Sequence, residues 1–137
     1  MRTALDTNIL SALWSGEPLA SRIESNLAEA RSHGGLVVCA PVFVELLAHP
    51  AATQNFIEGF LAETSIAVDF NLEESVWRQA AKSFAAYAKR RRHSTGDSPK
   101  RLVVDFIIAS HALLQADRLM TLDEKRYRLD FPKLRII

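Results

Sequence analysis

Three acidic residues stand alone in apolar stretches of this sequence. Each is the only Asp, Glu, Lys or Arg of its stretch: Asp6 in 3–16, Glu45 in 36–48 and Asp105 in 102–116. Removing an ionised carboxylate from water costs several kcal/mol unless something compensates it, and these stretches hold no cationic residue. A shared divalent cation would compensate all three, so the sequence predicts a carboxylate-cluster metal site.

A fourth acid, Asp123, follows the apolar run 119–121 and is surrounded by other charged residues. Taken alone, it is typical of a surface turn, just as Asp6 alone is typical of a helix N-cap. Asp69 is also the sole charge of its stretch, 64–72, but it precedes a predicted helix start and is assigned to that turn. We predict that the four acids Asp6, Glu45, Asp105 and Asp123 form both the catalytic group and the metal ligands.

The chemistry of these ligands restricts the metal and the reaction. Carboxylates without His or Cys partners form an all-oxygen site, which suits Mg²⁺ or Mn²⁺. The four histidines show no metal-ligand spacing with Cys39, which argues against zinc. Such clusters cleave phosphodiesters, because the metal activates water and neutralises phosphate charge. The sequence lacks a P-loop, a dinucleotide-binding glycine turn and a nucleophile elbow, which leaves a metal-dependent nuclease as the main hypothesis.

The elements that must position these acids alternate between strands and helices. Short apolar runs predict strands over 2–6, 36–40, 66–70 and 118–121, with 134–137 as a further candidate. Helical spacing predicts helices from about residue 9, then over 19–33, 41–50, 53–63, 71–92 and 102–116, the fifth of them opened by an Asn71/Glu74 capping box. This alternation predicts an α/β fold with a mostly parallel sheet and helices on both faces. Ligands bind such sheets beyond the carboxyl ends of the strands, where Asp6 and Asp123 are expected.

Length and composition limit the remaining possibilities. The chain has 137 residues, 48% of them apolar, and a formal net charge of +1. We therefore expect one domain over 1–137, with no overall attraction to polyanions. The single cysteine, Cys39, lies in an apolar run and predicts a core residue in a reducing cytoplasm. No apolar run approaches the roughly 18 residues of a membrane span, so neither secretion nor membrane insertion is expected.

A basic cluster follows the long helix and precedes Asp105. Its residues are typical either of a solvated helix end or of contacts to backbone phosphates. The candidate RNA contacts are Arg90, Arg91, Arg92, Lys100 and Arg101.

Four segments together resemble the PIN-domain family and, within it, the VapC-type toxins of bacterial toxin-antitoxin pairs. They are Leu5-Asp6-Thr7-Asn8, 41–46 (PVFVEL), 105–112 (DFIIASHA) and 119–123 (LMTLD). The resemblance covers the whole chain and implies a three-layer α/β/α sandwich. It also implies a Mg²⁺- or Mn²⁺-dependent endoribonuclease, a homodimer and a cognate antitoxin protein.

The same resemblance assigns residues position by position. Asp6, Glu45 and Asp105 match the three central acids of the family, and Asp123 matches the fourth. Asn8 and Thr121 match polar positions that support the site.

Two alternatives remain open. A non-catalytic RNA-binding or scaffold domain would keep this fold with an inactive site. A phosphatase of the aspartyl-phosphate type also begins with an Asp at a strand end, but it places a second Asp two residues on, where this sequence has Asn8.

Overall fold

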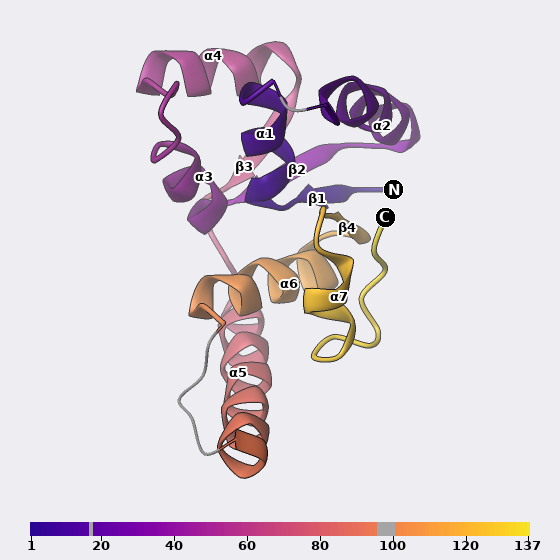
Figure 1. Cartoon of the computed structure of the whole chain (residues 1–137). Coiled ribbons are helices and arrows are strands. Elements are labelled where there is room, and N and C mark those ends of the chain that lie inside the picture. Colours follow the sequence, from indigo (N-terminus) through magenta and orange to yellow (C-terminus); the bar gives the residue numbers. More distant parts are fainter. Residues whose placement is uncertain (17, 96–100) are drawn as a thin grey trace.

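The fold is built on a parallel four-stranded sheet (Figure 1). The computed structural model describes residues 1–16, 18–95 and 101–137. Its strands are β1 (Thr3–Leu5), β2 (Leu36–Cys39), β3 (Ile66–Asp69) and β4 (Arg118–Met120). They lie in the order β3-β2-β1-β4, and every pairing between them is parallel. The predicted strands are confirmed, with ends that differ by at most one residue.

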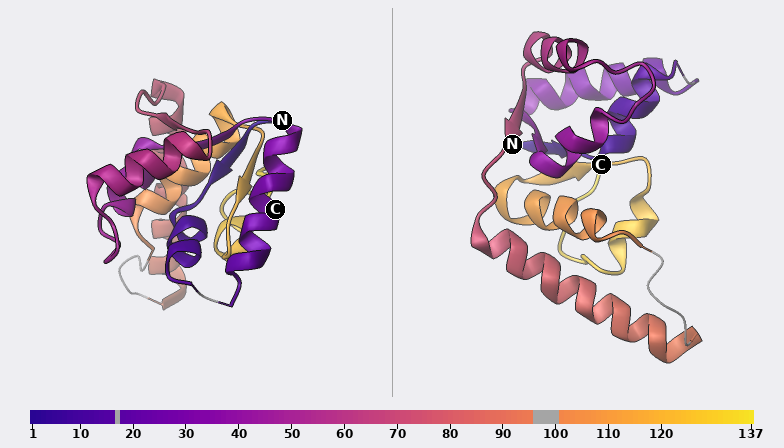
Figure 2. Two further views of the ribbon diagram at one scale, coloured as in Figure 1. Left: turned by 90° about the horizontal axis from the view of Figure 1, so that it is seen from above. Right: turned by 90° about the vertical axis from the view of Figure 1, so that its left-hand side faces the viewer.

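Helices cover both faces of this sheet, which confirms the α/β sandwich (Figures 1 and 2). One layer holds α1 (Thr7–Trp14), α2 (Ala20–His33), α3 (Ala40–Leu46) and α4 (Gln54–Glu63). The other holds α5 (Glu74–Thr95), α6 (Val103–Gln115) and α7 (Glu124–Arg128). In the part of the chain that the structure describes, no helix is long and apolar enough to cross a membrane.

The strand register brings the predicted site elements to one edge. Thr3 pairs with Leu36 and Leu5 pairs with Met120. Because the strands are parallel, their carboxyl ends meet at the same edge of the sheet. Asp6 follows β1, α3 follows β2, and Thr121 follows β4, so three chain segments converge there.

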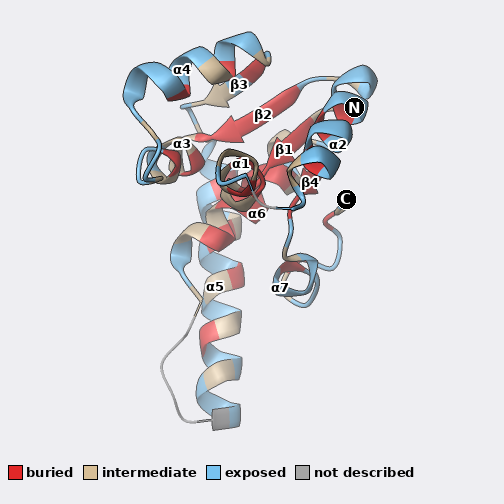
Figure 3. Ribbon diagram, turned by 45° about the horizontal axis from the view of Figure 1, so that its top comes forward, coloured by how far each residue is buried: buried red, intermediate tan, exposed pale blue. Residues whose placement is uncertain are grey.

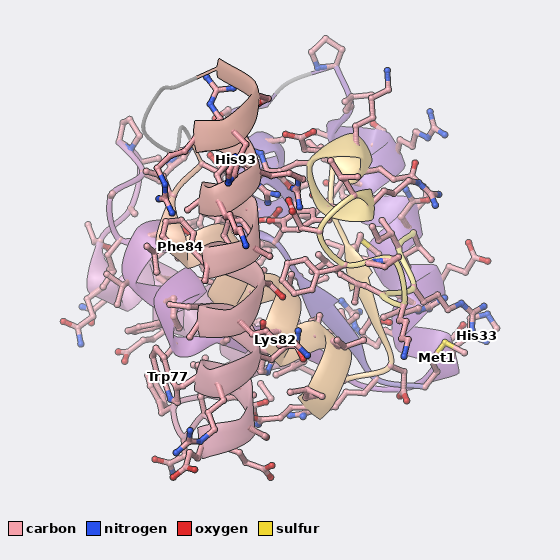
Figure 4. The ribbon with its side chains drawn as sticks, turned by 90° about the horizontal axis from the view of Figure 1, so that it is seen from below. Met1, His33, Trp77, Lys82, Phe84 and His93 are labelled. Carbon is pink, nitrogen blue, oxygen red and sulfur yellow. The ribbon has the colours of Figure 1, made fainter. Side chains whose placement is uncertain are left out.

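Helix α6 is the centre of the lower layer, because it packs between the sheet and α5 (Figure 3). Its Phe106 is fully buried, and the rings of Phe84, Tyr87 and Phe131 surround it at centroid distances of 5.2 to 5.9 Å. This sandwiched position explains why the sequence of α6 is apolar on nearly every side. Helix α5 is the outer element and shows Trp77, Lys82 and His93 along its length (Figure 4).

The turn between α2 and β2 depends on Gly34. Its φ is 156°, and an added Cβ would lie 2.0 Å from the carbonyl oxygen of Met1. The Met1 amino group donates to the carbonyl of His33 at 2.7 Å, and the two residues lie together at the edge of the molecule (Figure 4). Only glycine allows this close backbone approach.

Two local predictions are wrong. Helix α5 begins at Glu74, so Asn71 does not cap it; instead the Glu73 N–H donates to Gln115 Oε1 at 3.0 Å. Asp69 belongs to β3 rather than to a turn. It accepts from Arg2 at 2.9 Å and lies 2.8 Å from His111 Nε2. Burial raises the pKa of Asp69, but these two partners outweigh it and the net pKa is lowered.

The segment 134–137 is only partly the strand that its sequence suggests. It lies beside β4 through one parallel bridge, Leu119 with Ile136, outside the named strands. The Leu119 N–H donates to Arg135 at 2.8 Å, and the Ile137 N–H donates back to Leu119 at 2.9 Å. These bonds cover the outer edge of β4.

Candidate active site

Asp6 is held by two hydroxyl groups that come from distant parts of the chain. Its Oδ2 accepts from Thr121 Oγ1 at 2.9 Å and from Tyr127 Oη at 2.7 Å. The residue is 5% exposed, and although it precedes α1 its side chain makes no cap hydrogen bond. Among the described residues, its other oxygen, Oδ1, has no hydrogen-bond partner. A role as a simple N-cap therefore does not explain Asp6.

Thr121 and Asn8 form a small network beside Asp6. Asn8 Nδ2 donates to Thr121 Oγ1 at 3.3 Å, and the Leu122 N–H donates to Asn8 Oδ1 at 3.2 Å. The Asp123 N–H donates to the same Thr121 hydroxyl at 3.1 Å. This network fixes the hydroxyl so that its proton points at Asp6. It also ties the end of β4 to the start of α1.

We expect Tyr127→Phe and Thr121→Val each to lower the free energy of unfolding by about 1–3 kcal/mol, because each removes one donor from a buried carboxylate. The double variant should lose more than the sum, because the shared acceptor then has no donor left. Urea unfolding at neutral pH measures these values. Thr64→Val is the control, because it removes a hydroxyl bonded to a neutral carbonyl. Strict additivity would contradict a shared role at Asp6.

Asp105 lies in the first turn of α6 and is 7% exposed. Burial raises its pKa, and the negative charge of Asp6 raises it further, while Arg126 and Arg101 oppose this shift. Arg126 Nη1 lies 3.5 Å from Asp105 Oδ1, and Arg101 Nε lies 3.9 Å from Oδ2. The stretch 102–116 holds no cationic residue, yet Asp105 has two cationic neighbours in the fold. Arg101 directly precedes this stretch, and Arg126 reaches Asp105 from α7.

Glu45 is half-buried on α3, where Thr7 Oγ1 donates to its Oε1 at 2.6 Å. Because Thr7 directly follows Asp6, this hydrogen bond places Glu45 near the start of α1. Burial raises the pKa of Cys39 to about 12, and the charges of Asp6 and Glu45 add to this shift. Cys39 is thus a core residue, as predicted.

Asp123 lies just before α7 and is half-buried. Its Oδ2 forms an ion pair with Arg126, at 2.9 Å from Nε. Within 1–16, 18–95 and 101–137, no three His, Cys, Asp or Glu side chains are close enough together to hold a metal ion. The charge of Asp6 raises the pKa of Asp105, whereas Glu45 accepts a hydrogen bond from Thr7 and Asp123 forms an ion pair with Arg126.

The donor set nevertheless fits a hard cation. All four side chains offer carboxylate oxygens, and Asp6 Oδ1 has no partner among the residues described. Oxygen-only sets of this kind suit Mg²⁺ or Mn²⁺. Asp6 and Asp105 would be the main ligands, with Glu45 and Asp123 completing the shell directly or through water.

The basic residues predicted to contact RNA differ in their ion pairs and in their exposure. Arg90 pairs with Asp130 Oδ1 and Arg101 with Asp130 Oδ2, at 2.5 and 2.6 Å. Asp130 therefore neutralises part of the predicted RNA-contact cluster. Arg91 is half-buried, Arg92 is exposed, and Lys100 lies outside the described residues.

Three residues at the site were missed by the sequence analysis: Thr7, Arg126 and Tyr127. Thr7 directly follows Asp6, so proximity alone could have suggested it. Arg126 is three residues beyond Asp123 on a predictable helical turn, a spacing that favours an ion pair. Tyr127 gives no local signal, because its partner Asp6 is 121 positions away.

A scan against protein-family models matches the PIN domain over residues 3–132. The chain therefore belongs to the PIN domain family. No curated protein matches it significantly.

Solved structures share the fold. A chain of VapBC2 from Rickettsia felis, bound to a DNA fragment from their promoter, is 17% identical with a TM-score of 0.68, over 100% of this chain and 98% of that one. A chain of VapBC-1 from nontypeable Haemophilus influenzae is 24% identical with a TM-score of 0.70, over 100% of this chain and 97% of that one.

Proposed function

We propose that this protein is a metal-dependent endoribonuclease that hydrolyses RNA phosphodiester bonds at a Mg²⁺ or Mn²⁺ site. The observation that carries the proposal is the pair Asp6 and Asp105, two buried carboxylates at the carboxyl edge of a PIN-domain sheet, near enough that the charge of Asp6 raises the pKa of Asp105. Two acids confined this closely repel one another. A divalent cation would relieve that repulsion, which gives the pair a chemical purpose.

The residues then have distinct roles. Thr121 and Tyr127 hold Asp6 in one orientation through its Oδ2, which leaves Oδ1 available to a cation. Asn8 orients Thr121, and Glu45 and Asp123 supply further carboxylate oxygens. When bound, the cation would activate water and stabilise the charge that develops on phosphate.

The family and the fold also support a proposal about the proteins that this chain binds. VapBC structures that share the fold at full coverage support the proposal that this chain is the toxin of a toxin-antitoxin pair and binds a cognate antitoxin protein. We further propose a homodimer and a single nuclease domain over 1–137. Arg91 and Arg92 remain candidate RNA contacts, together with Lys100, whereas the ion pairs of Arg90 and Arg101 with Asp130 weaken their candidacy.

A second function keeps specific support. Arg126 and Arg101 neutralise part of the charge around Asp105, and the described acids do not group around one point. An RNA-binding scaffold with an inactive site would have these properties. The two functions differ in metal binding, because the scaffold needs none.

The deciding experiment is cleavage of a mixed transfer and ribosomal RNA pool by the purified protein. Reactions with Mg²⁺, with Mn²⁺ and with a chelator are compared by gel electrophoresis and end mapping. We expect discrete fragments that require metal. A folded protein that binds RNA yet yields no fragments and binds neither metal would favour the scaffold.

A further inference from the structure

Arg126 bridges two of the four acids. Its Nε lies 2.9 Å from Asp123 Oδ2, and its Nη1 lies 3.5 Å from Asp105 Oδ1. Asp123 precedes α7 and Asp105 lies on α6. One guanidinium group therefore joins the carboxylates of two elements and occupies oxygens that an oxygen-only metal site would use.

The second arginine of this region is fixed in place and cannot have the same role. Arg101 Nη1 donates to Asp130 Oδ2 at 2.6 Å and to the carbonyl of Arg126. Its guanidinium carbon lies 4.6 Å from the centre of the Phe106 ring. The side chain of Arg101 is only 14% exposed, against 44% for Arg126. Arg101 thus anchors the backbone of α7, while the end of the Arg126 side chain is free to reach solvent.

The charges around Arg126 define a competition. Arg126 pairs with both Asp105 and Asp123, and the negative charge of Asp6, which follows β1, also acts on Asp105. Arg101 is engaged with Asp130. Like charges repel at these short distances even in a high-dielectric environment. A divalent cation held by Asp105 and Asp123 would face the guanidinium at close range. The cation and the guanidinium therefore compete for these carboxylates, because their like charges repel one another at this range.

We propose that Arg126 is an internal counter-ion of the acid cluster, which the divalent cation must displace in order to bind. The inference rests on the metal site of the proposed function. In the metal-free protein, the Asp105–Arg126–Asp123 bridge compensates the acids. When the cation enters, Arg126 leaves the bridge and turns to solvent. Arg126 thereby sets the metal affinity of the site.

The test is a calorimetric titration of the full chain with MgCl₂ and with MnCl₂. Arg126→Gln should bind either metal about tenfold more tightly than the wild type, because it removes one close positive charge. The matched control is Arg128→Gln, two residues along the same helix, whose side chain pairs with Glu124. It makes the same change in net charge and should leave the affinity within about twofold.

Melting temperatures with and without Mg²⁺ give a second test of the counter-ion role of Arg126. Without metal, Arg126→Gln should melt below the wild type, because its acids lack their counter-ion. At saturating Mg²⁺ the two melting temperatures should converge. Unchanged metal affinity in Arg126→Gln, or an equal gain in Arg128→Gln, would overturn the inference, as would the absence of metal binding in both the wild type and Arg126→Gln.

The outcome is separable from that of the proposed function. Tighter metal binding by Arg126→Gln with no RNA cleavage would support the counter-ion and reject the nuclease. Metal-dependent cleavage with unchanged affinity in Arg126→Gln would support the nuclease and reject the counter-ion.

Discussion

Asp105→Asn should lose at least about 10²-fold of the RNA-cleavage rate while the protein remains folded, because the amide cannot supply the anionic oxygen that holds and neutralises a divalent cation. The fold should tolerate the change well. Burial and the nearby Asp6 raise the pKa of Asp105, so the ionised carboxylate is a cost to the folded state at neutral pH.

The sign of the pH dependence follows from this shift. A raised pKa means that the folded state binds the proton more tightly than the unfolded state. The wild type therefore loses stability as pH rises from the ordinary Asp pKa of 3.8 through the raised pKa of the folded state. Asp105→Asn lacks this loss, so its stability relative to the wild type should increase with pH across that window.

RNA-cleavage rates with metal present test the loss of activity. Urea unfolding of the metal-free protein between pH 3.5 and roughly 7 tests the pH dependence of stability. Glu58→Gln is the matched control, since it makes the same chemical change at an exposed position of α4. It should leave both quantities unchanged. Full activity in a folded Asp105→Asn protein would remove Asp105 from the site.

Phe106→Ala should lower the free energy of unfolding by about 3–5 kcal/mol, because it empties a fully buried position. Phe106 lies next to Asp105, beneath the Arg101 guanidinium, and inside the ring cluster of Phe84, Tyr87 and Phe131. Domains of this size are stable by only about 5–15 kcal/mol. The variant should therefore approach the limit of folding at neutral pH.

Chemical unfolding followed by circular dichroism measures this loss. Phe106→Leu keeps most of the volume and should lose less than half as much. Phe70→Ala is the control, because Phe70 is 63% exposed and its truncation should cost at most about 1 kcal/mol. A loss below about 1 kcal/mol in Phe106→Ala would show that the ring cluster does not hold α6.

The sequence alone determined the order of the four strands, the order of the helices up to α6, and the acids that these elements carry; it did not predict α7. The alternation of apolar runs with helical spacing is a local property, so β1, β2, β3 and β4 were found within one residue of their ends. The isolation of Asp6 and Asp105 in apolar stretches was also readable, because an unpaired buried charge is costly wherever it lies. Both acids prove to be buried.

The tertiary structure decided which partners those acids meet. Tyr127 reaches Asp6 across 121 positions, and Arg126 reaches Asp105 from a separate helix. Asp69 pairs with Arg2 and His111 across the sheet, although it was assigned to a turn. Periodicity fixes which face of an element is buried, but side-chain pairing depends on packing between elements, which local sequence does not encode. The acids were therefore predictable one at a time from the sequence, whereas the side chains that pair with them were not.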